Sequence, residues 1–182
     1  MAASEQPFTW RRLVRSSGPE ARAWVDEYEQ HRDLIRLSSK ALKLCHRRRF
    51  DEGFEALESM RRALRDRPAL PGSIRAVLDR YYFGVSGYYF YRTRRWDEAT
   101  EAMRQAKRAV VRAVEQAPFL LPLADACHEF CLHHARIARN QGRWREMFER
   151  IEDVRAMMRD QAPLCVLEDG SEVGYGVLTE HY

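Results

Sequence analysis

Residues Tyr81–Ala109 read YYFGVSGYYFYRTRRWDEATEAMRQAKRA, and this stretch decides the fold because it joins two helical patterns through one short basic turn. Two weaker copies of the turn occur elsewhere in the chain. Three strings align without gaps, at offsets of 46 and 48 residues: RRFDEG at Arg48–Gly53, RRWDEA at Arg94–Ala99 and GRWREM at Gly142–Met147. Internal repeats of this period are typical of stacked helical hairpins, in which neighbouring units cover each other's apolar faces.

Apolar residues recur at intervals of three and four through most of the chain, which is the period of an α-helix. Prolines and glycines interrupt the pattern at Pro68, Pro118 and Gly142. We therefore predict an all-α fold of three stacked antiparallel helical hairpins. The expected helices cover residues 19–48, 50–66, 74–93, 96–116, 122–140 and 143–160. The expected organisation is a flexible N-terminal arm (1–18), a helical repeat domain (19–162) and an acidic C-terminal strap or short hairpin (163–182).

Small residues occupy matching positions of the first helix in each copy. Counting back twelve residues from Gly53, Ala99 and Met147 leads to Ala41, Gly87 and Ala135. Where two helices cross closely, a side chain larger than methyl holds the backbones apart. The pattern therefore predicts a close crossing within each hairpin.

This arrangement resembles the tetratricopeptide repeat (TPR) family over about residues 34–160. The resemblance is clearest in the middle copy, where the matching residues are Phe83, Gly87, Phe90, Trp96, Ala99 and Ala106. The usual repeat of that family has 34 residues, whereas the helices expected here are longer. Gly53 and Met147 also stand where the family has alanine. An unrelated hairpin repeat or an irregular helical bundle is the alternative.

The resemblance implies a concave groove lined by the first helix of each hairpin. On this chain the groove residues would be Ile35, Ser39, Leu42, His46, Tyr81, Val85, Tyr88, Tyr91, Arg92, Glu129, Leu132, His133, Arg136, Arg139 and Asn140. We take Tyr81, Val85, Tyr88, Tyr91, Arg92, His133, Arg136, Arg139 and Asn140 as the candidate partner-binding residues. Tyrosine rings provide apolar contact area and guanidinium groups bind carboxylates, so the ligand would be a protein or peptide, including an acidic segment or a C-terminal carboxylate.

Two other interpretations of these residues stay open. The tyrosines can pack between repeats with their hydroxyl groups hydrogen-bonded at the rim. Alternatively, the acidic tail can occupy the groove, because the last twenty residues contain Glu168, Asp169, Glu172 and Glu180 but no lysine or arginine.

The cationic side chains are almost all arginine. The chain carries 31 lysines and arginines against 27 acidic residues, and only Lys40, Lys43 and Lys107 are lysines. Arginine is suited to bidentate recognition of phosphate. A nucleic-acid-associated regulatory module is therefore an alternative function, although interspersed acidic residues favour ordinary solvated helix faces.

Cys127, Cys131 and His134, in the segment CHEFCLHH, would lie on one side of a helix and are weak candidates for zinc ligands. Cysteine also behaves as a small buried apolar residue, and alanines share this face. We therefore expect a structural role and predict no metal and no cofactor.

No catalytic pattern stands out: the sequence has no glycine-rich phosphate loop and no His-Glu-x-x-His helix. It also lacks an apolar run long enough for a membrane span. We therefore expect a cytoplasmic, non-catalytic protein- or peptide-binding adaptor without membrane association. The ends of the repeat array could additionally support a homo-oligomer.

Overall fold

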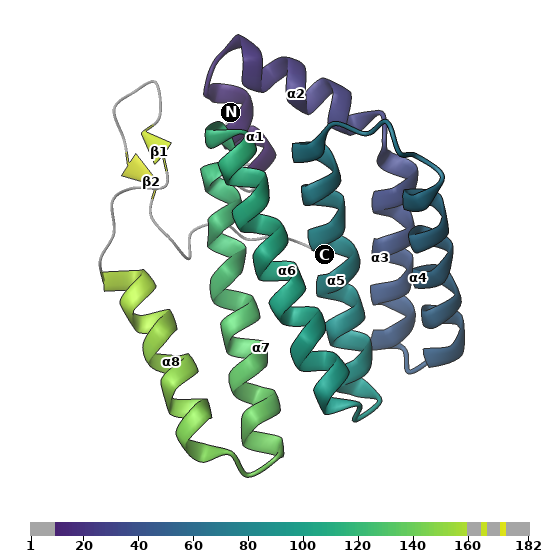
Figure 1. The fold of residues 1–182 in the computed structure, drawn as a ribbon, viewed down its shortest axis with the longest axis vertical. Helices are drawn as coiled ribbons and strands as arrows, with labels where there is room; N and C mark the ends of the chain where they lie inside the picture. Colours follow the sequence, from purple (N-terminus) through teal and green to yellow (C-terminus); the bar gives the residue numbers. More distant parts are fainter. Residues whose placement is uncertain (1–9, 160–164, 167–171, 174–182) are drawn as a thin grey trace, which may run out of the picture.

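The fold is all-α in a computed structural model that describes residues 10–159, 165–166 and 172–173 (Figure 1). This confirms the predicted class. In chain order the elements are α1 (Trp10–Ser16), α2 (Pro19–Glu29), α3 (Arg32–His46), α4 (Phe50–Arg65), α5 (Gly72–Arg92), α6 (Trp96–Gln116), a 3₁₀ segment η1 (Pro118–Asp125), α7 (Ala126–Asn140), α8 (Trp144–Arg159), β1 (Cys165–Val166) and β2 (Glu172–Val173).

Six of these helices form three consecutive antiparallel pairs, α3 with α4, α5 with α6, and α7 with α8. Further packing of α3 on α5 and of α6 on α7 joins the pairs, so α8 lies at one edge of the molecule and α4 at the other (Figure 1). That this arrangement is a TPR-like solenoid stays a prediction.

The turns inside the three pairs share one backbone conformation, at the positions that the sequence aligned. Arg48 and Arg94 have φ of 61°, and Gly142 has φ of 70°. All three therefore occupy the left-handed region that is typical of the residue just after a helix.

The hydrogen bonds that close these turns also match. The N–H of Arg49 donates to the carbonyl of Leu44 at 2.9 Å, and Arg95 and Arg143 make the same bond to Phe90 and Ala138, each at 2.9 Å. This six-to-one bond defines a Schellman motif, which satisfies a carbonyl that the helix end would otherwise leave unpaired.

An ion pair recurs immediately after each turn. Arg49 pairs with Glu52, Arg95 with Glu98 and Arg143 with Glu146. Each pair spans three residues of the first helical turn, where the carboxylate also interacts favourably with the helix dipole. The aligned strings therefore encode one local structure three times.

The small residues fit the expected close crossing in the first pair. A methyl carbon placed on Gly53 would lie 3.4 Å from the carbonyl oxygen of Ala41 and 2.9 Å from Cys45 Sγ. In the second pair the nearest neighbour of Gly87 is the side chain of Met103, one helical turn beyond Ala99. Gly87 therefore makes room for a methionine rather than for a backbone.

The single helix expected from Pro19 to Arg48 is broken at Gln30 and His31, so that α2 and α3 are separate (Figure 1). The break lets α2 lie across the ends of the other helices, where Trp24 and Tyr28 are buried. Their rings stack at 5.3 Å between centroids. Periodicity alone did not reveal the break, because the apolar spacing continues through it.

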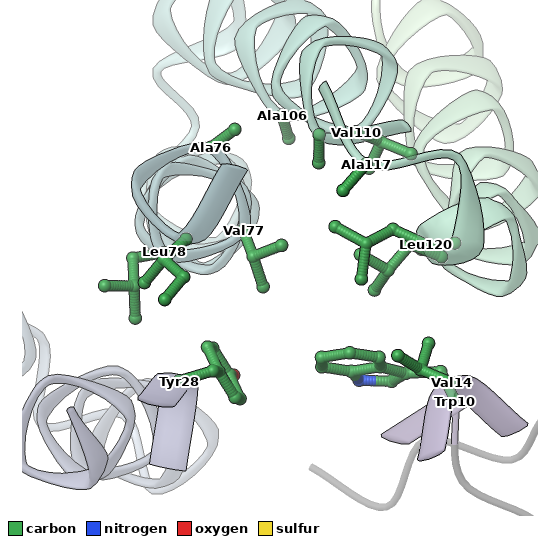
Figure 2. Packing of buried hydrophobic residues seen from close by; sticks show 14 of the residues in the cluster. Trp10, Val14, Tyr28, Ala76, Val77, Leu78, Ala106, Val110, Ala117 and Leu120 are labelled. Carbon is green, nitrogen blue, oxygen red and sulfur yellow. The ribbon is translucent and has the colours of Figure 1, made fainter. Parts of the chain in front are cut away.

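Residues 10–16 of the expected flexible arm form α1 and join the main core. Trp10, Leu13 and Val14 are each at most 2% exposed. Figure 2 shows Trp10 and Val14 of α1 pointing toward Leu120 of η1, with Tyr28 of α2 beside Leu78 of α5. The expected arm is therefore helical from Trp10 to Ser16, whereas residues 1–9 lie outside the described part of the chain.

The start of the fifth expected helix also differs from the expectation. Pro122 lies inside a 3₁₀ segment over residues 118–125, so the helix expected from Pro122 begins only at Ala126, as α7. In the expected C-terminal strap or hairpin, Cys165 pairs with Val173 and Val166 with Glu172 in an antiparallel ladder. The other residues after 159 lie outside the described part, as does the prediction that the acidic tail fills the groove.

The turn conformation leads to a stability prediction. Replacing Arg48 or Arg94 by glycine should raise the free energy of unfolding by about 1 kcal/mol, because glycine adopts positive φ without the Cβ penalty that arginine pays. Gly142→Arg should lower it by a similar amount. Urea denaturation of the purified variants measures both changes.

Arg47→Gly provides the matched control, since Arg47 ends α3 with φ of −80°. Glycine at that position should destabilise the protein. If Arg47→Gly and Arg48→Gly changed the free energy of unfolding equally, the positive φ of Arg48 would not be the cause of the change.

Candidate functional site

A cavity of about 380 Å³ lies between α3, α5 and α7, the first helices of the three pairs. Of the nine candidate partner-binding residues, Tyr81, Val85, Tyr88, His133 and Arg136 lie on its wall. Leu42, His46, Glu129 and Leu132, which belong to the larger expected groove, also line it. A volume of this size matches the pockets that hold small ligands or single side-chain groups.

The remaining candidates lie beside the cavity rather than on its wall. Arg92 Nη1 donates a hydrogen bond to the hydroxyl oxygen of Tyr88 at 2.6 Å. Asn140 Nδ2 donates to the hydroxyl of Tyr91 at 3.4 Å, and the Tyr91 ring contacts Trp96 at 5.8 Å between centroids. Arg139 is exposed on α7. These residues therefore extend the polar surface next to the cavity opening.

The tyrosine hydroxyls already have partners within the protein. Besides the bonds to Tyr88 and Tyr91, the indole Nε1 of Trp10 donates to the hydroxyl of Tyr81 at 3.2 Å. This agrees with the interpretation in which the tyrosines pack between helices and satisfy their hydroxyls at the rim. Their rings remain available to a ligand as apolar surface, whereas their hydroxyls would have to exchange partners.

The charge of the cavity wall is predominantly positive. Arg80 and Arg136 line it, and Glu129 is the one carboxylate among its lining residues that the structure describes. Arg80 is only 1% exposed, and its guanidinium lies over the Tyr81 ring at 4.6 Å from the centroid. A buried cation strengthens the local potential because little water screens it. The cavity therefore favours an anionic group.

His133 is held neutral by its surroundings. Burial lowers its pKa to about 4, and the neighbouring Arg136 charge acts in the same direction. The rings of Tyr88 and Tyr91 stand 6.3 and 6.4 Å from the imidazole, centroid to centroid. Its Nδ1 atom is buried and has no hydrogen-bond partner among the described residues.

The projection from the sequence missed several lining residues, among them Arg80, Gly84 and His128. A signal for them existed. Arg80 and Gly84 precede Tyr88 at spacings of four on α5, and His128 precedes Leu132 and Arg136 in the same way on α7. The family pattern began one residue later on each helix, at Tyr81 and Glu129, and it passed over Gly84.

The weak zinc candidates are not gathered around one point. Cys131 is buried with Lys107 Nζ at 3.9 Å from its sulfur atom, and burial raises its pKa. His134 Nε2 lies 3.0 Å from Glu146 Oε1 on α8. Within the described residues no group of three or more histidine, cysteine or acidic side chains could hold a metal ion.

A second hollow lies on α6, α7 and α8. It has a volume of about 540 Å³ and is lined by the cations Arg104, Lys107, Arg108, Arg112 and Arg150 around apolar side chains that include Val111 and Phe130. Nearby carboxylates partly neutralise it, since Arg112 pairs with Asp79 at 3.4 Å and Arg150 with Asp153 at 2.7 Å.

Comparison of the chain with protein-family models, with curated proteins and with solved structures found no match. Among the helices in the described ranges, none is both long enough and apolar enough to span a lipid bilayer.

The low pKa of His133 predicts how stability depends on pH. In the unfolded chain a histidine has its ordinary pKa of about 6.5, so between pH 6.5 and 4 the unfolded state takes up a proton that the folded state does not. Stability should therefore fall as the pH is lowered through this range, by about 2 kcal/mol between pH 6.5 and 5.

Chemical denaturation between pH 7.5 and 5 measures this effect. His133→Asn should lose stability less steeply than the wild type, whereas His31→Asn, at the break between α2 and α3, should keep the wild-type slope. Parallel curves for wild type and His133→Asn would contradict the assignment of a buried neutral imidazole.

Proposed function

We propose that the chain is a TPR-like hairpin-repeat scaffold that binds a segment of another protein, without catalysing a reaction. The segment would present a carboxylate and apolar side chains to the cavity between α3, α5 and α7. The observation that carries the proposal is the convergence of three first helices on one cavity with a cationic, largely apolar wall.

The scaffold part of the proposal is supported by the repeated turn. The same left-handed residue, the same closing hydrogen bond and the same arginine–glutamate pair recur at all three turns. A repeated turn gives each pair a similar crossing geometry, so successive first helices can present their faces to one side.

The ligand part is supported by the composition of the wall. Leu42, Val85 and Leu132 offer apolar contact, while Arg136 offers charged hydrogen-bond donors. Such sites recognise amphiphilic groups, in which apolar area supplies affinity and a few polar contacts fix the orientation.

An array of random heptapeptides with free C-termini, weighted toward acidic and apolar residues, should select ligands for the wild-type protein at pH 7.5. The tightest peptide, labelled with a fluorophore, should bind Arg136→Ala about tenfold more weakly, since a charge-assisted hydrogen bond contributes about 1–2 kcal/mol. Fluorescence anisotropy measures the affinity.

Arg145→Ala is the control, because Arg145 is an exposed arginine of α8 that does not line the cavity. It should bind like the wild type. An array without binders, or equal losses from Arg136→Ala and Arg145→Ala, would refute the proposed site.

Nucleic-acid binding is the second candidate function, and the hollow on α6, α7 and α8 is the observation that favours it. Five cations line this hollow, and Lys107 among them has no carboxylate partner within the described residues. The neutralised arginines nearby weaken this candidate relative to the cavity.

If this candidate holds, random-sequence single-stranded RNA should bind with a steep salt dependence. The double variant Lys107→Ala, Arg108→Ala should reduce the slope of log K against log salt by about 1–2, since each lost phosphate contact removes about 0.7–0.9 from it. Arg61→Ala, Arg62→Ala on α4 is the control and should leave the slope unchanged. An RNA affinity that does not change with salt concentration would exclude nucleic-acid binding at this hollow.

A further inference from the structure

Three of the six histidines in the chain, His46, His128 and His133, line the cavity between α3, α5 and α7. His133 on α7 contacts α5 directly and is linked through Tyr88 to α3. Its ring contacts Tyr88 and Tyr91 of α5, and the Tyr88 ring in turn contacts His46 of α3 at 5.0 Å between centroids. Histidines in such a setting can change charge within the physiological pH range when their surroundings change.

The titratable and charged groups around His133 come from each helix that borders the cavity. They are His46 on α3, Arg80, Tyr81 and Tyr88 on α5, and His128, Glu129 and Arg136 on α7. Tyr91 and Arg92 of α5 stand just outside the wall. Of these neighbours, Arg136 carries the charge that opposes a positive charge on the imidazole in the absence of a ligand.

We propose that a carboxylate bound in this cavity brings a proton onto His133, so that ligand binding is coupled to proton uptake. This inference rests on the proposed function in that it concerns the same cavity, and it adds how the site is regulated. The bound carboxylate would lie near both Arg136 and His133. It would offset the arginine charge that disfavours protonation and would accept a hydrogen bond from the imidazolium.

The geometry gives His133 the capacity for this role. His133 lines the cavity, and its Nδ1 atom is buried without a hydrogen-bond partner among the described residues. Nδ1 pairs with a ligand oxygen only if the imidazole turns toward the cavity, and no existing hydrogen bond to that atom among the described residues has to break. Only the protonated imidazole donates from both ring nitrogens. The pKa of about 4 means that His133 carries no proton at neutral pH in the unliganded protein.

The sign of the pH dependence follows from this linkage. Because the liganded state holds the proton more tightly than the unliganded state, affinity should increase as the pH falls toward 5. The increase cannot exceed tenfold per pH unit for one proton. Since the ordinary pKa of a carboxylic acid is near 4, the ligand remains mostly ionised throughout this range.

His134, the next residue of α7, provides an internal comparison. It lies within 3.0 Å of Glu146 on α8 and borders the two hollows near α8 rather than the cavity. Burial lowers its pKa and Glu146 opposes this shift. A ligand in the cavity should therefore leave the titration of His134 unchanged.

The test uses phenylacetate, a small carboxylate with an apolar ring that fits the cavity volume, and phenylacetamide as its uncharged counterpart. Carbon-detected or ¹H–¹³C NMR of the histidine rings, at constant ionic strength, follows the titration of each histidine from pH 7.5 to 4. His133→Asn and His134→Asn variants assign the two signals.

With saturating phenylacetate, the pKa of His133 should rise from about 4 to about 6, whereas His134 should titrate as it does without the ligand. The dissociation constant of phenylacetate should fall at least fivefold between pH 7.5 and 5 for the wild type and for His134→Asn, but should stay constant for His133→Asn. Phenylacetamide should show no pH dependence.

Either of two results would overturn the inference: no phenylacetate binding at millimolar concentration, or binding that leaves the pKa of His133 at its unliganded value. The peptide array at pH 7.5 tests the proposed function separately. If peptides bind in the array without proton uptake, the proposed binding site stands and the proton coupling is rejected. If no peptide binds in the array, the proposed peptide-binding function is rejected.

Discussion

The left-handed residue at each hairpin turn is the constraint on which the rest of the structure depends. Arg48, Arg94 and Gly142 reverse the chain in the same way, and the six-to-one hydrogen bond that follows each of them ends the first helix at a fixed residue. Because the reversal is the same, each second helix runs back antiparallel to its partner. Small residues such as Gly53 then allow the two helices to approach closely.

Placing three first helices toward one side creates a space that their side chains do not fill. Large aromatic side chains from α5 form much of its wall, and the contact of Trp10 with Tyr81 ties the N-terminal helix to the same wall. The buried guanidinium of Arg80 and the neutral imidazole of His133 then share a poorly hydrated environment. Arg136 lies on the same wall and is exposed, so it is the arginine that would pair with a bound anion.

The repeated local structure could be predicted from the sequence, because it depends on short-range patterns. The aligned strings RRFDEG, RRWDEA and GRWREM located all three turns, and the spacing of apolar residues predicted most of the helices. The interruption between α2 and α3 could not be predicted in this way. It depends on where Trp24 and Tyr28 find apolar partners, which is a property of the assembled core.

The candidate site shows the same division. Tyr88, His133 and Arg136 could be projected onto one side from helical register, but the burial of Arg80 depends on contacts that no local pattern encodes. Likewise, the sequence predicted a flexible arm over residues 1–18, whereas the packing of α1 on η1 and α2 places Trp10 in the core. Helical register predicts which side of a helix a residue lies on, whereas its burial depends on the other helices that pack against it.

Amide chemical-shift mapping with the array-selected peptide tests most directly whether the cavity between the first helices is the binding site. We predict that the largest changes fall on the cavity-lining residues of α3, α5 and α7, including Leu42, Val85 and His133. Changes confined to the hollow around Lys107, Arg108 and Arg150 would contradict the account.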